Sequence, residues 1–151
     1  MWQVKIEIEP RGKQRPRLAS KGRYARAYTP APTVQWTKAF RVHLQQLWQG
    51  EPIPAGVAVG LKVVAVFSRP QRLLRRKDPE HRLYKTSKPD GDNVLKIVAD
   101  SCNGLCWHDD AQVAEMQVQT LYAAKGEPAC IELSIYELEP CQMYHSCDTG
   151  A

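Results

Sequence analysis

The chain is predicted to fold as a single α+β domain, with a mixed β-sheet of about four strands and two main helices in the order β-α-β-α-β-β. Three observations predict this class. Apolar and polar residues alternate over several ranges, apolar residues recur at helical spacing over two others, and 151 residues suit one domain with its own core. The last two alternating ranges flank a short turn at residues 125–128 and are expected to pair as an antiparallel hairpin, which makes the sheet mixed.

The first half of the chain is predicted to supply two strands and a helix. Residues 2–9 alternate apolar and polar side chains up to Pro10, as in a strand with one buried face. Residues 29–50 open with Thr-Pro-Ala-Pro and then repeat apolar residues at helical spacing as far as Gly50, which predicts the first helix. Residues 57–67 alternate again and become apolar on both faces near their end, which is typical of a central strand.

The second half is predicted to supply the second helix and the last two strands. A turn at Pro89–Gly91 precedes this helix, Asp92 or Asn93 is its expected N-cap, and Asn103-Gly104 is its expected end. Two alternating ranges follow and predict the last strands, at residues 114–122 and 129–136.

The stretch from Lys88 to Gln112 concentrates acidic residues. Its five carboxylates and one central lysine are Asp90, Asp92, Asp100, Asp109, Asp110 and Lys96. On a helix, Asp92 and Lys96 lie one turn apart on one face, and Asp100 continues the line. If the following strand lies beside the start of this helix, Asp90, Asp92 and Asp110 converge. Three adjacent carboxylates resist ionising together unless a cation joins them, and oxygen ligands suit Mg²⁺ or Mn²⁺.

The same carboxylates also have a purely structural interpretation. Acidic residues at a helix start are stabilising by roughly 0.3–1 kcal/mol through the helix dipole, and Asp-Gly-Asp-Asn is ordinary turn chemistry. A calcium-binding EF-hand loop is excluded, because counting from Asp90 puts Leu95 where glycine is required and Ser101 where glutamate is required. The residues alone leave the metal site and the helix cap as equal alternatives.

Several residues of this stretch agree in order and spacing with one known family: Lys88-Pro89-Asp90, Asp92-Asn93, Lys96, Asp100, Asn103-Gly104 and Trp107 through Gln112. Together they resemble the RusA family of Holliday junction resolvases, small endonucleases of phages and prophages. A looser likeness extends to Lys13-Gln14-Arg15-Pro16-Arg17, and a RusA-like fold is expected over residues 1–138.

The resemblance implies an endodeoxyribonuclease that resolves four-way junctions by paired symmetric nicks in DNA recombination and repair. It implies Asp90, Asp92 and Asp110 as ligands of Mg²⁺, for which Mn²⁺ would substitute, and Lys96 as a further catalytic residue. Neighbouring strand residues point oppositely, so only one of Asp109 and Asp110 should face the metal, and the family pattern favours Asp110. It also implies a homodimer, because two symmetric cuts need two sites.

Two neighbours of these residues are expected to have structural roles. Asp100 is expected to pair with Lys96 along the helix face, and Trp107 is expected to lie in the core. His108 is expected to be a loop residue and not a general base.

Basic residues point independently to a polyanionic partner. The net charge is +5, and fifteen of the 21 lysines and arginines lie in residues 11–26 and 69–88. The first range is expected to be a loop or irregular hairpin; it contains Tyr24, is followed by Tyr28 and has no acidic residue. The second range is expected to be mobile without nucleic acid. The predicted phosphate contacts are Lys13, Arg15, Arg17, Arg23, Arg69, Arg72, Arg75, Arg76, Lys77 and Lys88.

Two other functions remain open from the sequence. One is a restriction-like nuclease that acts on flaps or duplex ends and uses Pro89-Asp90 as its acidic start. The spacing from Asp92 to Lys96 does not match the Glu/Asp-x-Lys pattern of such enzymes. The other is a non-catalytic DNA-binding module whose carboxylates only cap a helix.

Compartment and chain ends give further expectations. The sequence has no stretch of eighteen apolar residues, so a cytoplasmic protein without a membrane partner is expected. Residues 139–151 are expected to be a disordered tail. The odd number of cysteines suits a reducing compartment. Two groupings contain potential zinc ligands but lack the paired spacing of structural sites: Cys102, Cys106 and His108, or Cys141, Cys147 and His145.

Overall fold

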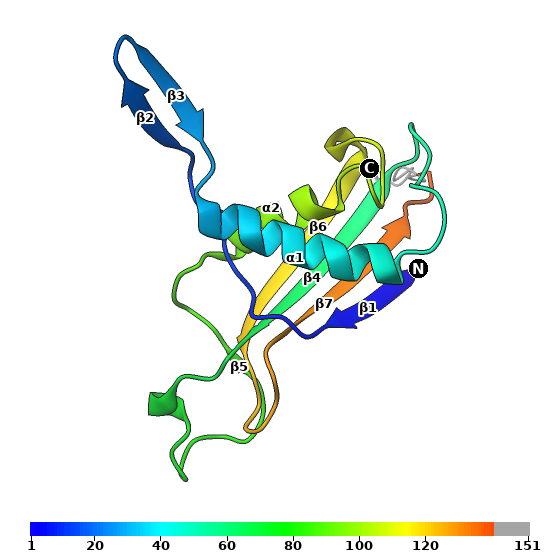
Figure 1. Ribbon diagram of the computed structural model, residues 1–151. Helices are drawn as coiled ribbons and strands as arrows, with labels where there is room; N and C mark the ends of the chain where they lie inside the picture. The colour runs from blue at the N-terminus through cyan, green and yellow to red at the C-terminus, as the bar shows by residue number, and fades with distance from the viewer. Residues whose placement is uncertain (141–151) are drawn as a thin grey trace, which may run out of the picture.

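Two helices cover one face of a five-stranded mixed sheet in the computed structural model, which describes residues 1–140 (Figure 1). The sheet contains β1 (Trp2–Ile6), β4 (Val59–Phe67), β5 (Leu83–Tyr84), β6 (Val113–Tyr122) and β7 (Cys130–Glu137). The helices are α1 (Ala31–Leu47) and α2 (Gly91–Cys102), and a separate hairpin consists of β2 (Arg17–Lys21) and β3 (Tyr24–Tyr28). The remaining elements are two 3₁₀ turns, η1 (Gln71–Leu73) and η2 (Asp110–Gln112). The predicted α+β class with two main helices is confirmed, whereas the short β5 was not predicted.

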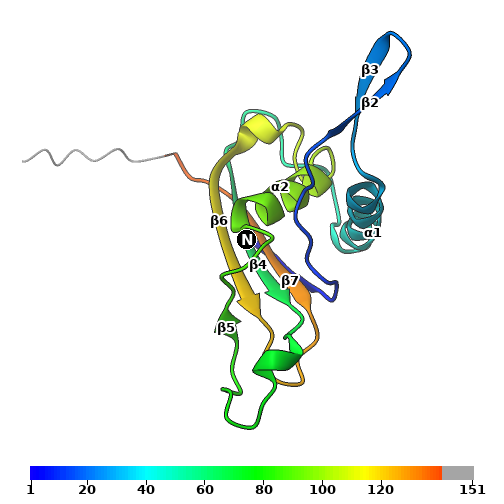
Figure 2. The ribbon, with the colours of Figure 1, turned by 90° about the vertical axis from the view of Figure 1, so that its left-hand side faces the viewer.

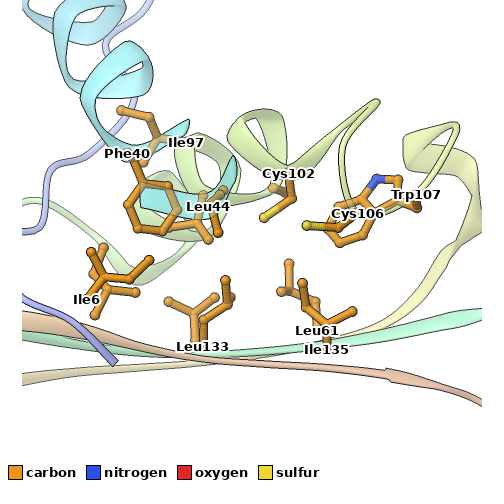
Figure 3. Packing of buried hydrophobic residues seen from close by; sticks show 14 of the residues in the cluster. Ile6, Phe40, Leu44, Leu61, Ile97, Cys102, Cys106, Trp107, Leu133 and Ile135 are labelled. Carbon is orange, nitrogen blue, oxygen red and sulfur yellow. The ribbon is translucent and has the colours of Figure 1, made fainter. Parts of the chain in front are cut away.

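The core lies between the helices and the sheet (Figure 3). Phe40 and Leu44 of α1 and Ile97 of α2 are buried against Leu61 and Leu133 of the sheet. Because Phe40 and Leu44 are four residues apart, they lie on one side of α1. Burying each such side chain contributes roughly 1.5–3 kcal/mol to the stability of the fold. The apolar residues that predicted the helices therefore also pack them against the sheet.

β4, and not β6, is the neighbour of β7, so the predicted terminal hairpin is wrong. The strand order is β1-β7-β4-β6-β5. β4 pairs with β7 antiparallel, with Leu61 opposite Ile135, and with β6 in parallel, with Leu61 opposite Met116. The turn at residues 125–128 therefore carries the chain across the end of β4. β4 is buried along most of its length, and β7 and β6 flank it on its two edges.

β4, α2 and β6 form a β-α-β unit, because a helix returns the chain between two parallel strands. α2 runs antiparallel to these strands. Its first residue, Gly91, is so close to β6 that an added Cβ would lie 3.3 Å from Val118, in the second half of that strand. The start of α2 therefore lies at the carboxyl end of β4, which is where α/β units commonly bind ligands.

The segment between β4 and α2, predicted to be mobile, is organised by its own arginine side chains. Arg69 donates hydrogen bonds to the backbone carbonyls of Leu73, Pro79 and His81 at 2.8, 2.6 and 3.1 Å. These bonds use all three guanidinium nitrogens. The prediction that Arg69 contacts phosphate is therefore corrected, because its guanidinium group is already committed to folding this segment.

Arg82 anchors the end of the same segment to the sheet. Its guanidinium donates to the Glu127 carboxylate through Nε at 3.0 Å and through Nη2 at 2.5 Å, and Nη2 also reaches Glu132 of β7 at 2.7 Å. The Arg82 hydrogen bonds hold the pKa of the Glu127 carboxyl below its ordinary value, and the two carboxylates raise the pKa of Arg82. A two-point pair of this kind fixes geometry as well as charge.

Some predictions concern residues at or beyond the limit of the described chain. The predicted tail and the grouping of Cys141, His145 and Cys147 lie outside the described residues, apart from positions 139 and 140. Within residues 1–140, Cys102 and Cys106 are buried in the core, whereas His108 is exposed. No helix in the same range combines the length and apolar character needed to cross a membrane.

Candidate active site

An open groove of about 830 Å³ lies between the start of α2 and the segment that follows β1. Glu9, Gly12 and Lys13 line one side, and Asp90 and Asn93 line the other. The groove forms because α2 begins at the carboxyl end of β4 and the chain after β1 passes the same place. Any substrate group that approaches Asp90 along this groove also meets Lys13.

Close backbone contacts hold the two sides of the groove together. The Lys13 N–H donates to the Asn93 carbonyl at 3.0 Å. Gly12 approaches Pro89 so closely that an added Cβ would lie 2.5 Å from the Pro89 Cβ. Only glycine permits this approach without a shift of the chain. The segment after β1 is therefore fixed against the turn that carries Asp90.

Asp90 and Asp92 present exposed carboxylates at the start of α2. The helix begins at Gly91, and Asp90 occupies the N-cap position that was predicted for Asp92 or Asn93. The Asp90 side chain makes no capping hydrogen bond. Asp92 is 67% exposed, and its Oδ2 lies 3.6 Å from the Nζ of Lys96, one turn further along the helix as predicted. The helix-cap interpretation therefore fails for Asp90, whose carboxylate is available to a ligand.

Asp110 does not join these carboxylates within one chain. Its Oδ1 accepts a hydrogen bond from Trp107 Nε1 at 3.1 Å, beyond the end of α2, and Asp109 caps the η2 turn beside it. Trp107 is fully buried, as predicted. α2 is 12 residues long, so its ends are about 18 Å apart. Residues 1–140 contain no group of three or more acidic, histidine or cysteine side chains arranged to hold a metal ion. The predicted convergence of Asp90, Asp92 and Asp110 is wrong for a single chain.

Asp100 pairs with Lys13 and not with Lys96, contrary to the prediction. The Lys13 Nζ lies 2.6 Å from Asp100 Oδ2, and the two side chains are 38% and 41% exposed. This pair is a second tie between α2 and the segment after β1. Among the described residues, Lys96 therefore has only Asp92 as an ion-pair partner.

Lys85 is a residue of this site that the sequence analysis missed. Although charged, it is only 9% exposed. Its Nζ donates to the carbonyls of Ser87 and Pro89, the latter at 3.3 Å, and lies 4.4 Å from the centre of the Phe67 ring. Burial lowers the pKa of the Lys85 ammonium, and the nearby Asp90 opposes that shift. Lys85 thus holds the turn that leads into Asp90, but in sequence it is one more cation in a basic range.

If this site cleaves DNA with the help of a metal ion, as the sequence resemblance implies, replacing Lys85 with methionine is expected to slow cleavage without weakening DNA binding. Methionine replaces the apolar stem of lysine but leaves the carbonyls of Ser87 and Pro89 without their donor, so the turn before Asp90 loosens. The expected loss in turnover is roughly 10–100-fold, the range for groups that orient metal ligands. Single-turnover cleavage and junction affinity are measured beside Lys38→Met, which removes an exposed lysine from α1. A loss of thermal stability with unchanged turnover would contradict the positioning role.

The two basic ranges lie on either side of the start of α2 (Figure 1, Figure 2). The β2–β3 hairpin projects beyond one end of the molecule, and η1 lies at the opposite end. Lys13, Arg69 and Arg75 already have protein partners. The other predicted phosphate contacts are exposed and form no ion pair among the described residues: Arg15, Arg17, Arg23, Arg72, Arg76, Lys77 and Lys88.

Comparisons with known proteins find a family model and a relative that match parts of this chain. The family model described as endodeoxyribonuclease RusA matches residues 7–135. That range contains the groove, α2 and both basic ranges. A Bacillus subtilis (strain 168) protein, "Uncharacterized protein YqaN", is 39% identical over 56 residues. The matched part is 37% of this chain and 37% of that relative, so the chain spans well under half of the relative's length.

Proposed function

Because the chain belongs to the RusA family of endodeoxyribonucleases, we propose that it is a Mg²⁺-dependent nuclease that resolves four-way DNA junctions by paired, symmetric nicks. The observation that carries the proposal is the uncapped carboxylate of Asp90 in a groove flanked by basic residues, with Asp92 two residues further along the chain. A carboxylate pair that faces phosphate repels it unless a cation is present. A helix that required only capping would use the Asp90 side chain for that purpose.

The donor set at the start of α2 suits a hard cation. Mg²⁺ is commonly held by one or two carboxylates together with phosphate oxygens of the substrate and water. Asp90 and Asp92 would supply these carboxylates, and Mn²⁺ shares the preference for oxygen ligands. When bound, the ion supplies charge neutralisation at the phosphate and an acidified water.

The chain's own side chains are assigned complementary tasks. Lys96 lies within 3.6 Å of Asp92 and is placed to offset negative charge at the phosphate. Lys88 lines the groove beside Asp90 and is expected to hold the DNA backbone. Lys13 lines the other side, where its ion pair with Asp100 ties the segment after β1 to α2. Lys85 acts on the turn before Asp90 and is a positioning residue.

A homodimer is part of the proposal because it gives Asp110 a role. Within its own chain, Asp110 is separated from Asp90 by about the length of α2, roughly 18 Å. In the proposed dimer, Asp110 of one subunit completes the acidic centre of the other. Two equivalent centres related by a twofold axis would then match the symmetry of a four-way junction.

The proposal is tested with a panel of DNA substrates of shared sequence. Labelled four-way junction, 5′-flap and linear duplex are incubated with the purified protein and Mg²⁺. The junction is expected to be cut in preference to the others, at a pair of symmetric positions. Preferential cutting of the flap or duplex ends would favour a restriction-like nuclease. Binding of all three without a cut would favour a non-catalytic DNA-binding module.

A further inference from the structure

The β2–β3 hairpin stands clear of the rest of the molecule (Figure 1, Figure 2). Leu18 and Tyr24 are 77% and 81% exposed. No acidic residue occurs between Glu9 and Glu51, and no ion pair among the described residues involves the hairpin arginines. The hairpin is thus an arm of positive charge with no covering in the described chain. A two-stranded hairpin is only marginally stable by itself in water, so a hairpin that projects in this way implies a binding partner that packs against it.

The strand register divides the hairpin into two unlike faces. Residues directly opposite one another in an antiparallel pair share a face, and successive residues alternate. Arg17 lies opposite Tyr28 and Ala19 opposite Arg26, and Tyr24 lies on the same side of β3 as Arg26 and Tyr28. These pairs form the basic face. The second face carries only small or aliphatic side chains, namely Leu18, Ser20, Ala25 and Ala27. The positive charge and the tyrosines are therefore gathered on one side of the hairpin.

We infer that the basic face of β2–β3 docks on a duplex arm of the DNA, in the major groove next to the branch point. This inference rests on the proposed function. B-DNA's major groove is about 12 Å wide and admits a two-stranded ribbon. The guanidinium groups of Arg17 and Arg26 donate hydrogen bonds to phosphate oxygens or to guanine edges, and the tyrosine hydroxyls donate to phosphate oxygens. The second face is turned to solvent, because it carries no positive charge to attract the DNA backbone.

The reach of the hairpin sets where these contacts fall. Its base is fixed at the groove, because Lys13 N–H bonds the Asn93 carbonyl at 3.0 Å and Gln14 N–H bonds Thr33 Oγ1 at 3.4 Å. Five residue pairs extend from this base, which corresponds to about 17 Å. At about 3.4 Å per base pair, this is about five base pairs. The arm is therefore expected to contact one duplex arm within about half a turn of the cut.

The test compares substitutions on the two faces of the hairpin. Junction affinity is measured by fluorescence anisotropy across a salt series for the native protein, Arg17→Ala/Arg26→Ala and Ser20→Ala/Ala27→Ser. The basic-face variant is expected to bind at least roughly fivefold more weakly. The slope of log affinity against log salt should fall by about 1.8, since each lost phosphate contact contributes about 0.9. The second-face variant should match the native protein in both measurements. Equal thermal stability shows that these exposed positions leave the fold intact.

Two results would overturn the inference. One is an unchanged affinity and salt slope for the basic-face variant, and the other is an equal loss for both faces. The binding assay needs no cleavage, so a failure of the proposed nuclease function leaves this test readable. Conversely, normal cleavage with an unchanged salt slope would contradict the hairpin inference alone.

Discussion

Asp92→Asn is expected to abolish junction cleavage while junction binding is retained or becomes tighter. Asparagine keeps the size of the side chain but removes the charge that holds a cation, and it also removes a charge that repels phosphate. Residues that only orient metal ligands are worth about 10–100-fold, so loss of a ligand should cost more than about 100-fold in cleavage rate. The rate is measured in single turnover with Mg²⁺, and affinity is measured with EDTA.

The matched control for this substitution is Glu80→Gln. Glu80 lies in the segment between β4 and α2, and its carboxylate pairs with Lys125 at 3.3 Å, away from the groove. Both substitutions raise the net charge by one unit, so a change in general attraction to DNA affects both alike. Loss of cleavage in Asp92→Asn alone identifies the acidic centre. Full cleavage by Asp92→Asn would contradict its role as a ligand.

Local periodicity explains which parts of the structure could be predicted from the sequence. Phe40 and Leu44 are four residues apart, and so are Asp92 and Lys96, so a helix brings each pair together whatever the rest of the chain does. β4 was recognisable because apolar residues cover both of its faces near its end. The position of Trp107 in the core followed from its size and apolar character.

Non-local pairing explains what could not be predicted. A short connection from β6 to β7 suggested a hairpin, but β4 lies between them, paired in parallel with β6. A separate assumption misplaced Asp110. The start of the strand after α2 was expected to lie beside the start of α2, whereas a parallel β-α-β unit puts the start of its helix and the start of its second strand at opposite ends. The strand–helix–strand succession from β4 to β6 was the signal that favoured the correct topology.

Side-chain environment was equally invisible in the sequence. Lys85, Arg69 and Arg72 all lie in one basic range, yet Lys85 is buried, Arg69 bonds three carbonyls and Arg72 is exposed. Composition predicts the charge of such a range but not which of its cationic side chains are buried or bonded within the protein. Only the last of these three remains available to phosphate.

A mixed dimer of two inactive variants is expected to regain activity. In the proposed dimer each centre takes Asp90 and Asp92 from one subunit and Asp110 from the other. If one subunit carries Asp92→Asn and the other Asp110→Asn, both substitutions fall in the same centre. The second centre then contains only native residues. A centre confined to one chain would be damaged in both subunits and would gain nothing from mixing.

The decisive measurement is therefore the nicking of a labelled four-way junction by this mixed dimer, purified through two different affinity tags. The expected result is inactivity of each variant alone and single, unpaired nicks by the mixed dimer in Mg²⁺. A mixed dimer of Asp90→Asn and Asp92→Asn should stay inactive, because each of its centres carries one substitution. Junction binding without nicking by the Asp92→Asn and Asp110→Asn dimer, or cleavage by Asp110→Asn alone, would contradict the two-subunit acidic centre.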